Sequence, residues 1–368
     1  MWQYVCQYMD VMPESLTFNG EAIMPQQEPL VLIGAVPSPY TRKMVALLRY
    51  RNIAYQVIWG DPKEILQQKG IAAPKVGLLP TFLMPDENGQ LQAITDSTPI
   101  IRRLEDEQVE RRVVPSDPAM AFIDYLIEDF ADEWCTKYMF HYRWYPEKDA
   151  DNAGTLLPLF HRVDIADSPL NQFKAYITQR QVNRLGVVGS NEVTAPLIDA
   201  SYRRFLVVME LHLQAQPFVL GQRPSACDFA IYGQLTQLIG FDPSSREIAH
   251  EIAPRVVAWT GLMEDQSGLD PAMDGWNSVD STPQSLNGLL IEIGRVYAPT
   301  LLANAVALEN GDKSWETEID GSVWSQQSFP YQGKCLTWIR DEYFALSDAD
   351  RSRIDALLEG TGCEVLFN

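Results

Sequence analysis

Basic residues and histidine are scarce in this chain of 368 residues. Lysine and arginine number 29 against 49 aspartates and glutamates, which gives a formal net charge of -20, and there are 4 histidines. Nucleic-acid phosphates are bound by clustered lysine and arginine, so nucleic acid is not an expected partner. With so few histidines, the acidic residues are not expected to hold a metal ion, and no metal site is predicted.

Paired cysteines and long apolar runs are also missing. The 5 cysteines are scattered and none lies in a Cys-x-x-Cys pattern, so neither a disulfide framework nor a zinc site is predicted. No window approaches the ~18 consecutive apolar residues of a membrane-spanning helix, and the N-terminus lacks the basic segment of a signal peptide. These absences predict a soluble protein of a reducing compartment, the cytoplasm, with no membrane partner.

Strand and helix patterns alternate over residues 29–112. The apolar run "LVLIGAV" predicts a buried strand, a helix follows from Thr41, and "AYQVIWG" predicts a second strand parallel to the first. The stretch "PTFLMPDENGQLQAI" predicts two strands around an Asn-Gly turn, and "DSTPIIRRLEDE" predicts another helix. This order of elements is that of a thioredoxin-like domain.

The rest of the chain is predicted to form three segments: an N-terminal extension and linker over 1–28, an all-helical domain over 113–270, and a C-terminal extension over 271–368. In the helical domain, Ser225 and Asp228 have the spacing of a capping box at a helix start. The C-terminal extension is predicted to be of α/β type, with one helix over 286–308, a hairpin that turns at an Asp-Gly pair, and a last helix near 348–358.

The residues "VPSPYTRKM" join the first strand to the first helix. A redox protein of this kind places Cys-Pro-Tyr-Cys there, whereas this chain has Ser38 and Thr41, so no disulfide can form. The free N–H groups and dipole of a helix N-terminus favour negative charge. Ser38 can therefore donate its hydroxyl to a thiolate that a substrate brings, which would favour the ionised form. The alternative is that Ser38 only caps the helix.

Two further stretches predict binding positions. In "GLLPTFL", Pro80 is predicted to follow a cis peptide bond that presents the N–H and C=O of Leu79 to an extended peptide; the alternative is a plain strand-entry proline. In "ITDSTPII", Asp96 and Ser97 stand at a helix start, where they can bind an α-amino and an α-carboxylate group or can simply cap the helix.

Taken together, "SPYTRK", "LLPTF" and "TDSTPIIRRLE" resemble the glutathione S-transferase superfamily in order and spacing, and "RPSACDFAIYGQL" resembles the capping-box stretch of its helical domain. The chain is similar to a serine-type member with the C-terminal extension of some larger bacterial members. The resemblance implies an α/β thioredoxin-like N-terminal domain, an all-α glutathione-transferase-type domain and an extra C-terminal α/β extension.

The resemblance also implies a function and roles for residues. Ser38 would stabilise the glutathione thiolate, Leu79 beside cis Pro80 would pair with the cysteinyl backbone, and Asp96 and Ser97 would hold the γ-glutamyl end. Glutathione would be the co-substrate, its thiolate would attack a small apolar electrophile, and the protein would be a cytoplasmic homodimer.

An aromatic set at the start of the helical domain is expected to face an apolar co-substrate, together with Tyr40: Tyr138, His141 and Tyr142. The alternative is that these rings belong to the core or to a dimer interface. The carboxylates of the same stretch are predicted to form a solvated, ion-paired helix face, with Glu133 four residues before Lys137.

Two other functions stay open at this point. One is a glutathione-dependent lyase, isomerase or dehalogenase, which would share the thiol site. The other is a non-catalytic binding or assembly protein of the same fold, because fold does not settle function. The large extension favours the second, and so does Leu78, since the family often has lysine or a similar residue two positions before the cis-proline.

Overall fold

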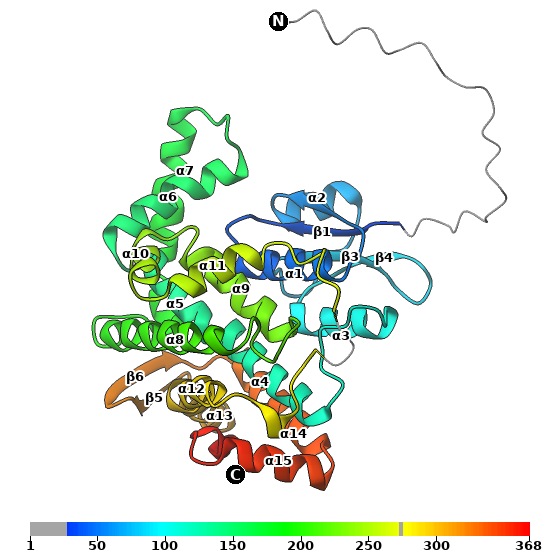
Figure 1. Ribbon diagram of the computed structural model, residues 1–368. Helices are drawn as coiled ribbons and strands as arrows, with labels where there is room; N and C mark the ends of the chain where they lie inside the picture. Colours follow the sequence, from blue (N-terminus) through cyan, green and yellow to red (C-terminus); the bar gives the residue numbers. More distant parts are fainter. Residues whose placement is uncertain (1–27, 272–274) are drawn as a thin grey trace, which may run out of the picture.

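The computed structural model describes residues 28–271 and 275–368 (Figure 1). The predicted N-terminal extension over 1–28 therefore lies outside the described residues, apart from Glu28. The elements after it follow the predicted order: an α/β part, a run of helices, and a C-terminal extension that contains a hairpin.

A mixed four-stranded sheet forms the core of the α/β part. Its strands are β1 (Leu30–Gly34), β2 (Tyr55–Trp59), β3 (Thr81–Pro85) and β4 (Leu91–Ile94). They lie in the order β2-β1-β3-β4, with β1 parallel to β2 and the other two pairs antiparallel. The turn between β3 and β4 contains Gly89 at a φ of 78°, a backbone conformation that glycine adopts without strain. The predicted thioredoxin-like order is confirmed.

Helices cover both faces of this sheet: α1 (Pro39–Tyr50), α2 (Pro62–Lys69) and α3 (Ser97–Glu107). Because successive side chains of a strand point to opposite faces, neighbouring residues of β1 enter different clusters. Leu32 packs in the cluster that contains α1 and α3, whereas Ile33 packs with Leu66 of α2. Helix α1 is thereby placed between the sheet and the helical part (Figure 1).

The helical part contains α4 (Pro118–Glu133), α5 (Cys135–Trp144), α6 (Glu147–His161), α7 (Asp167–Val182), η1 (Leu185–Val188), α8 (Ala195–Ala215), α9 (Ala226–Leu238), α10 (Pro243–Ile252) and α11 (Pro254–Leu262). The predicted capping box is confirmed at α9, where Ser225 N donates to Asp228 Oδ2 at 2.9 Å. Helix α9 packs on α1, and Gly233 permits this, since a Cβ there would lie 2.5 Å from Pro39 O.

The C-terminal extension contains η2 (Val279–Ser281), α12 (Ser285–Glu292), η3 (Ile293–Tyr297), α13 (Ala298–Asn310), β5 (Ser314–Ile319), β6 (Ser322–Gln327), α14 (Pro330–Ala345), α15 (Asp348–Leu358) and η4 (Cys363–Phe367). The predicted hairpin and the helices on either side of it are confirmed, and α14 is an element that the sequence did not predict. The extension packs on α4 and α8, and one hydrophobic core cluster runs from Leu32 of β1 to Leu366 of η4.

One helical run among the described residues, Ser285–Asn310, is long and apolar enough to cross a membrane by length and composition. Within the fold, 56% of its apolar window is buried. The run packs against α8, α14 and β5, as a core helix does.

Candidate ligand site

Ser38 lies at the corner between β1 and α1 and is the N-cap residue of α1. Its Oγ accepts a hydrogen bond from Thr41 N at 3.2 Å, so Ser38 does cap the helix. A hydroxyl oxygen can accept one hydrogen bond and still donate its own proton, and no described residue accepts that proton. Ser38 is 8% exposed, so a ligand atom that reached its hydroxyl would be largely removed from water.

The segment before β3 ends beside this corner. The Leu79–Pro80 peptide bond is cis, as the sequence predicts. The register pairs Thr81 with Ile33 of β1, which places Pro80 at the end of β1 from which the Ser38 corner starts. Among the hydrogen bonds of the described residues, none involves the N–H or C=O of Leu79. An extended peptide can therefore pair with both groups.

Asp96 and Ser97 lie where β4 leads into α3. Asp96 has a φ of 83°, in the left-handed region that residues other than glycine rarely adopt, and it makes no capping hydrogen bond. Its Oδ2 accepts a hydrogen bond at 2.9 Å from the hydroxyl of Tyr331, which lies on α14. Burial raises the pKa of Asp96, and the hydrogen bond from Tyr331 opposes that rise.

A buried lysine on α1 stands behind this pair. Lys43 Nζ donates to Ser97 Oγ at 3.1 Å, to Glu128 Oε1 at 2.8 Å and to Asp132 Oδ2 at 2.6 Å. Lys43 is 1% exposed, and Glu128 and Asp132 are also buried. Burial alone would lower the pKa of Lys43, but the two carboxylates outweigh burial and raise it, so the ammonium keeps its charge. Its three protons all have acceptors.

The prediction of a solvated, ion-paired face on this stretch is wrong. Glu128 and Asp132 are buried against α1, and no ion pair joins Glu133 to Lys137 among the described residues. Lys137 Nζ instead donates to Gln326 Oε1 of β6 at 3.1 Å. The physical reason is that side chains of α1 reach α4 and the C-terminal extension packs on α4, so the carboxylates face protein where the sequence alone predicted water.

Residues of the helical part hold the Ser38 corner in place. Arg143 Nη1 donates to Pro37 O at 3.1 Å, and Gln237 Nε2 donates to Val36 O at 3.4 Å. The guanidinium of Arg143 makes two further hydrogen bonds, at 2.9 and 3.1 Å, to the carboxylate of Asp242. Such a paired guanidinium is geometrically fixed, so the corner has a rigid support on one side.

The four residues predicted to face a co-substrate already have protein partners. Their polar contacts are Tyr40 OH to Asp132 O at 2.7 Å, Tyr138 OH to Ser201 Oγ at 2.7 Å, His141 Nδ1 to Ser190 Oγ at 2.8 Å, and Tyr142 OH to Asp199 Oδ1 at 2.6 Å. Tyr138, His141 and Tyr142 are buried, and burial lowers the pKa of His141 to about 4. Their role toward a co-substrate stays a prediction.

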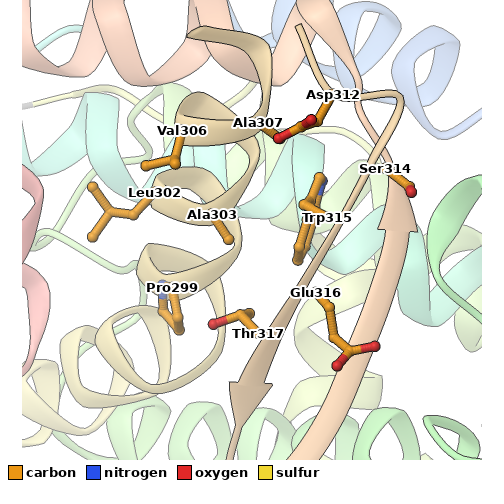
Figure 2. Close-up of a pocket in the computed structure, with 10 residues that line it drawn as sticks. All are labelled: Pro299, Leu302, Ala303, Val306, Ala307, Asp312, Ser314, Trp315, Glu316 and Thr317. Carbon is orange, nitrogen blue, oxygen red and sulfur yellow. The ribbon is translucent and has the colours of Figure 1, made fainter. Parts of the chain in front are cut away.

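A surface pocket in the described part of the chain lies in the C-terminal extension. Its volume is about 570 Å³, and Figure 2 shows its walls on α13 and on β5, with Asp312 in the segment between them. The side chains of Leu302, Val306 and Trp315 make it largely apolar. Neither this pocket nor another one, between α8 and α12, is lined by Ser38, Pro80 or Asp96.

Residues 32–112 match the family model described as "Glutathione S-transferase, N-terminal domain". This part of the chain is a glutathione S-transferase N-terminal domain. The domain contains the Ser38 corner, cis Pro80, and the Asp96-Ser97 pair. The comparison with curated proteins gives no match.

Solved structures of glutathione S-transferases resemble the chain only distantly. One from Methylobacterium radiotolerans, in complex with glutathione sulfonate, has 15% identity and a TM-score of 0.38, covering 67% of this chain and 98% of that one. One from Burkholderia graminis, with two glutathione molecules bound per subunit, has 16% identity and a TM-score of 0.40, covering 73% and 90%. A Tau class enzyme from mango has 17% identity and a TM-score of 0.37, covering 71% and 95%. The family assignment rests on the match over residues 32–112.

Proposed function

We propose that the protein binds glutathione at the Ser38 corner and activates its thiol for attack on a small apolar electrophile. The observation that carries the proposal is the Ser38 hydroxyl, which stands at the N-terminus of α1 with its proton uncommitted. Its neighbours support it: the free backbone groups of Leu79 suit the cysteinyl residue, and Asp96 and Ser97 suit the γ-glutamyl end. A cytoplasmic homodimer stays a prediction from the resemblance.

The reaction needs the ligand's thiol in its ionised form. A cysteine thiol titrates at about pH 8.5 in water, and a hydrogen bond from Ser38 together with the field of the helix N-terminus would lower that value. The thiol proton leaves to water, the sulfur electron pair forms a bond to the electrophilic carbon, and the leaving group departs with the electrons of the bond that breaks. A fall of two pKa units corresponds to about 3 kcal/mol of stabilisation of the thiolate.

Calorimetric titration of glutathione in buffers of different ionisation enthalpy tests the proposal. At pH 7.5 the protein should release most of one proton for each glutathione bound, whereas Ser38→Ala should bind with little proton release. Ser347→Ala is a matched control, because Ser347 Oγ caps α15 by accepting from Asp350 N at 3.1 Å. Each variant loses an N-cap worth about 1 kcal/mol, but only Ser38→Ala should change the proton release.

Two results would refute this function. Absence of heat with millimolar glutathione would leave the binding or assembly alternative. Equal proton release by Ser38→Ala and the wild type would show that Ser38 acts only as a cap. With binding established, a screen of electrophiles that differ in leaving group would separate transfer from lyase, isomerase or dehalogenase activity.

A further inference from the structure

A residue of the C-terminal extension reaches the predicted amino-acid end of the ligand site. Tyr331 lies in the first turn of α14 and is separated from Asp96 by 235 positions in the chain. Its hydroxyl donates to Asp96 Oδ2 at 2.9 Å. Burial and the charge of Asp96 raise the pKa of Tyr331, so the hydroxyl stays protonated and remains the donor.

The start of α14 is fixed by a buried asparagine of α13. Asn304 Oδ1 accepts from Phe329 N at 2.7 Å, and Asn304 Nδ2 donates to Phe329 O at 3.0 Å. The ring of Tyr331 packs edge-on against Trp338, with 6.0 Å between the ring centroids. Asn304 therefore fixes the backbone of this turn, and Trp338 fixes the ring of Tyr331. Together these contacts orient the Tyr331 hydroxyl toward Asp96.

The direction of each hydrogen bond shows what the pair Asp96-Ser97 can still bind. A carboxylate offers about four acceptor positions, and Tyr331 occupies one on Oδ2, so Asp96 can still accept hydrogen bonds from an ammonium group. The ammonium group of lysine has no acceptor atom, so Lys43 must donate to Ser97 Oγ. The hydroxyl proton of Ser97 can therefore be donated to another group. An acceptor and a donor on adjacent residues match the ammonium and the carboxylate of one amino acid.

We infer that the C-terminal extension completes the amino-acid end of the ligand site. Tyr331 is a positioning residue that holds Asp96 for the ammonium group of the ligand, as Lys43 holds Ser97 for its carboxylate. The inference rests on the proposed function and goes beyond it, since it assigns selectivity for a free α-ammonium group to a residue outside the glutathione S-transferase domain. It also gives the extension a role in the same site without a second subunit.

Binding of two ligands to two variants tests this inference. The ligands are glutathione and its desamino analogue, in which hydrogen replaces the γ-glutamyl amino group. Tyr331→Phe should bind glutathione about tenfold more weakly, close to the lower end of what loss of a hydrogen bond to a charged group costs, and should bind the analogue as the wild type does. Tyr343→Phe is the matched control, because Tyr343 lies on the same helix and its hydroxyl donates to Asp355, within the extension.

The pH dependence of binding gives a readout that mere loss of packing would not change. The charged and titratable groups that face Asp96 are Lys43 on α1, Glu128 and Asp132 on α4, and Tyr331 and Cys335 on α14. Burial raises the pKa of Asp96 and the Tyr331 hydroxyl lowers it, so Tyr331→Phe should move the acid limb of glutathione binding to higher pH. The acid limb of Tyr343→Phe should stay where it is in the wild type.

Every result of these measurements either supports or overturns the inference. Tenfold weaker binding of glutathione alone, with a shifted acid limb, supports the inference. Wild-type affinity in Tyr331→Phe, or equal loss for both ligands, overturns it and leaves the proposed function standing. Tighter binding of glutathione by Tyr331→Phe also overturns it, since α14 would then obstruct the site. Failure of the wild type to bind glutathione overturns the proposed function and this inference with it.

Discussion

Replacement of Lys43 by methionine should destabilise the protein strongly. The ammonium group of Lys43 is 1% exposed and makes ion pairs of 2.8 Å with Glu128 and 2.6 Å with Asp132. Methionine keeps most of the side-chain volume, so the packing of α1 on α4 and α9 changes little. The two carboxylates, however, would remain buried without a cation. Loss of one partner of a buried ion pair costs about 3–5 kcal/mol, a large part of a total stability of about 5–15 kcal/mol.

The size of this effect should depend on pH. Lys43 lowers the pKa of Glu128 and opposes the rise that burial causes in the pKa of Asp132. Without Lys43 the pKa of each carboxylate rises in the folded state. Between a carboxylate's pKa in the unfolded chain and its higher pKa in the folded protein, the folded protein therefore binds more protons than the unfolded chain. Stability is then retained at low pH and lost as pH rises through the folded-state pKa values. Lys43→Met should therefore be less destabilising at pH 5 than at pH 8.

Urea denaturation of three variants at both pH values measures the effect. Lys148→Met is the matched control, because Lys148 also pairs with a carboxylate, Glu247 at 3.2 Å, but both side chains are exposed. Its cost should be under about 1 kcal/mol. The triple variant Lys43→Met, Glu128→Gln, Asp132→Asn also removes the two buried carboxylate charges. It should recover much of the lost stability. The reasoning is refuted if Lys43→Met costs no more than Lys148→Met, or if its cost is the same at both pH values.

Two further predictions concern His141 and the contact between α9 and α1. Burial lowers the pKa of His141 from 6.5 to about 4, so its contribution to stability is complete above pH 6.5 and is lost as pH falls towards 4. NMR titration of the His141 ring should give a midpoint near 4, and a midpoint near 6.5 would contradict its burial. Gly233→Ala should destabilise by about 1–3 kcal/mol, since the added Cβ would lie 2.5 Å from Pro39 O. Gly261→Ala, in a helix with open space around it, should be neutral or stabilising by up to about 1 kcal/mol, and equal thermal shifts in the two variants would be inconsistent with the close approach of α9 to α1.

Much of the fold could be predicted because its signals are local. Short apolar runs predicted the strands. The Asn-Gly and Asp-Gly pairs predicted both hairpin turns, where Gly89 and Gly321 have positive φ values. The capping box of Ser225 and Asp228 placed the start of α9 correctly. Helices α6, α10 and α14 were missed, although Pro243 and Pro330 stand at the first positions of two of them. Proline is common there because its missing N–H has no helical acceptor to lose.

Local sequence patterns were enough to predict a thioredoxin-like domain and the order of its expected binding residues, because the strand, turn and helix-start signals each lie within a few positions of the chain. The surroundings of these residues follow from tertiary packing. Lys43 meets Glu128 across 85 positions and Tyr331 meets Asp96 across 235, and no local pattern records either contact. For the same reason the carboxylates of α4 were predicted to face water, since the elements that bury them come from both ends of the chain. Exposure and charge pairing depend on packing between distant segments, and such packing exists only in the folded chain.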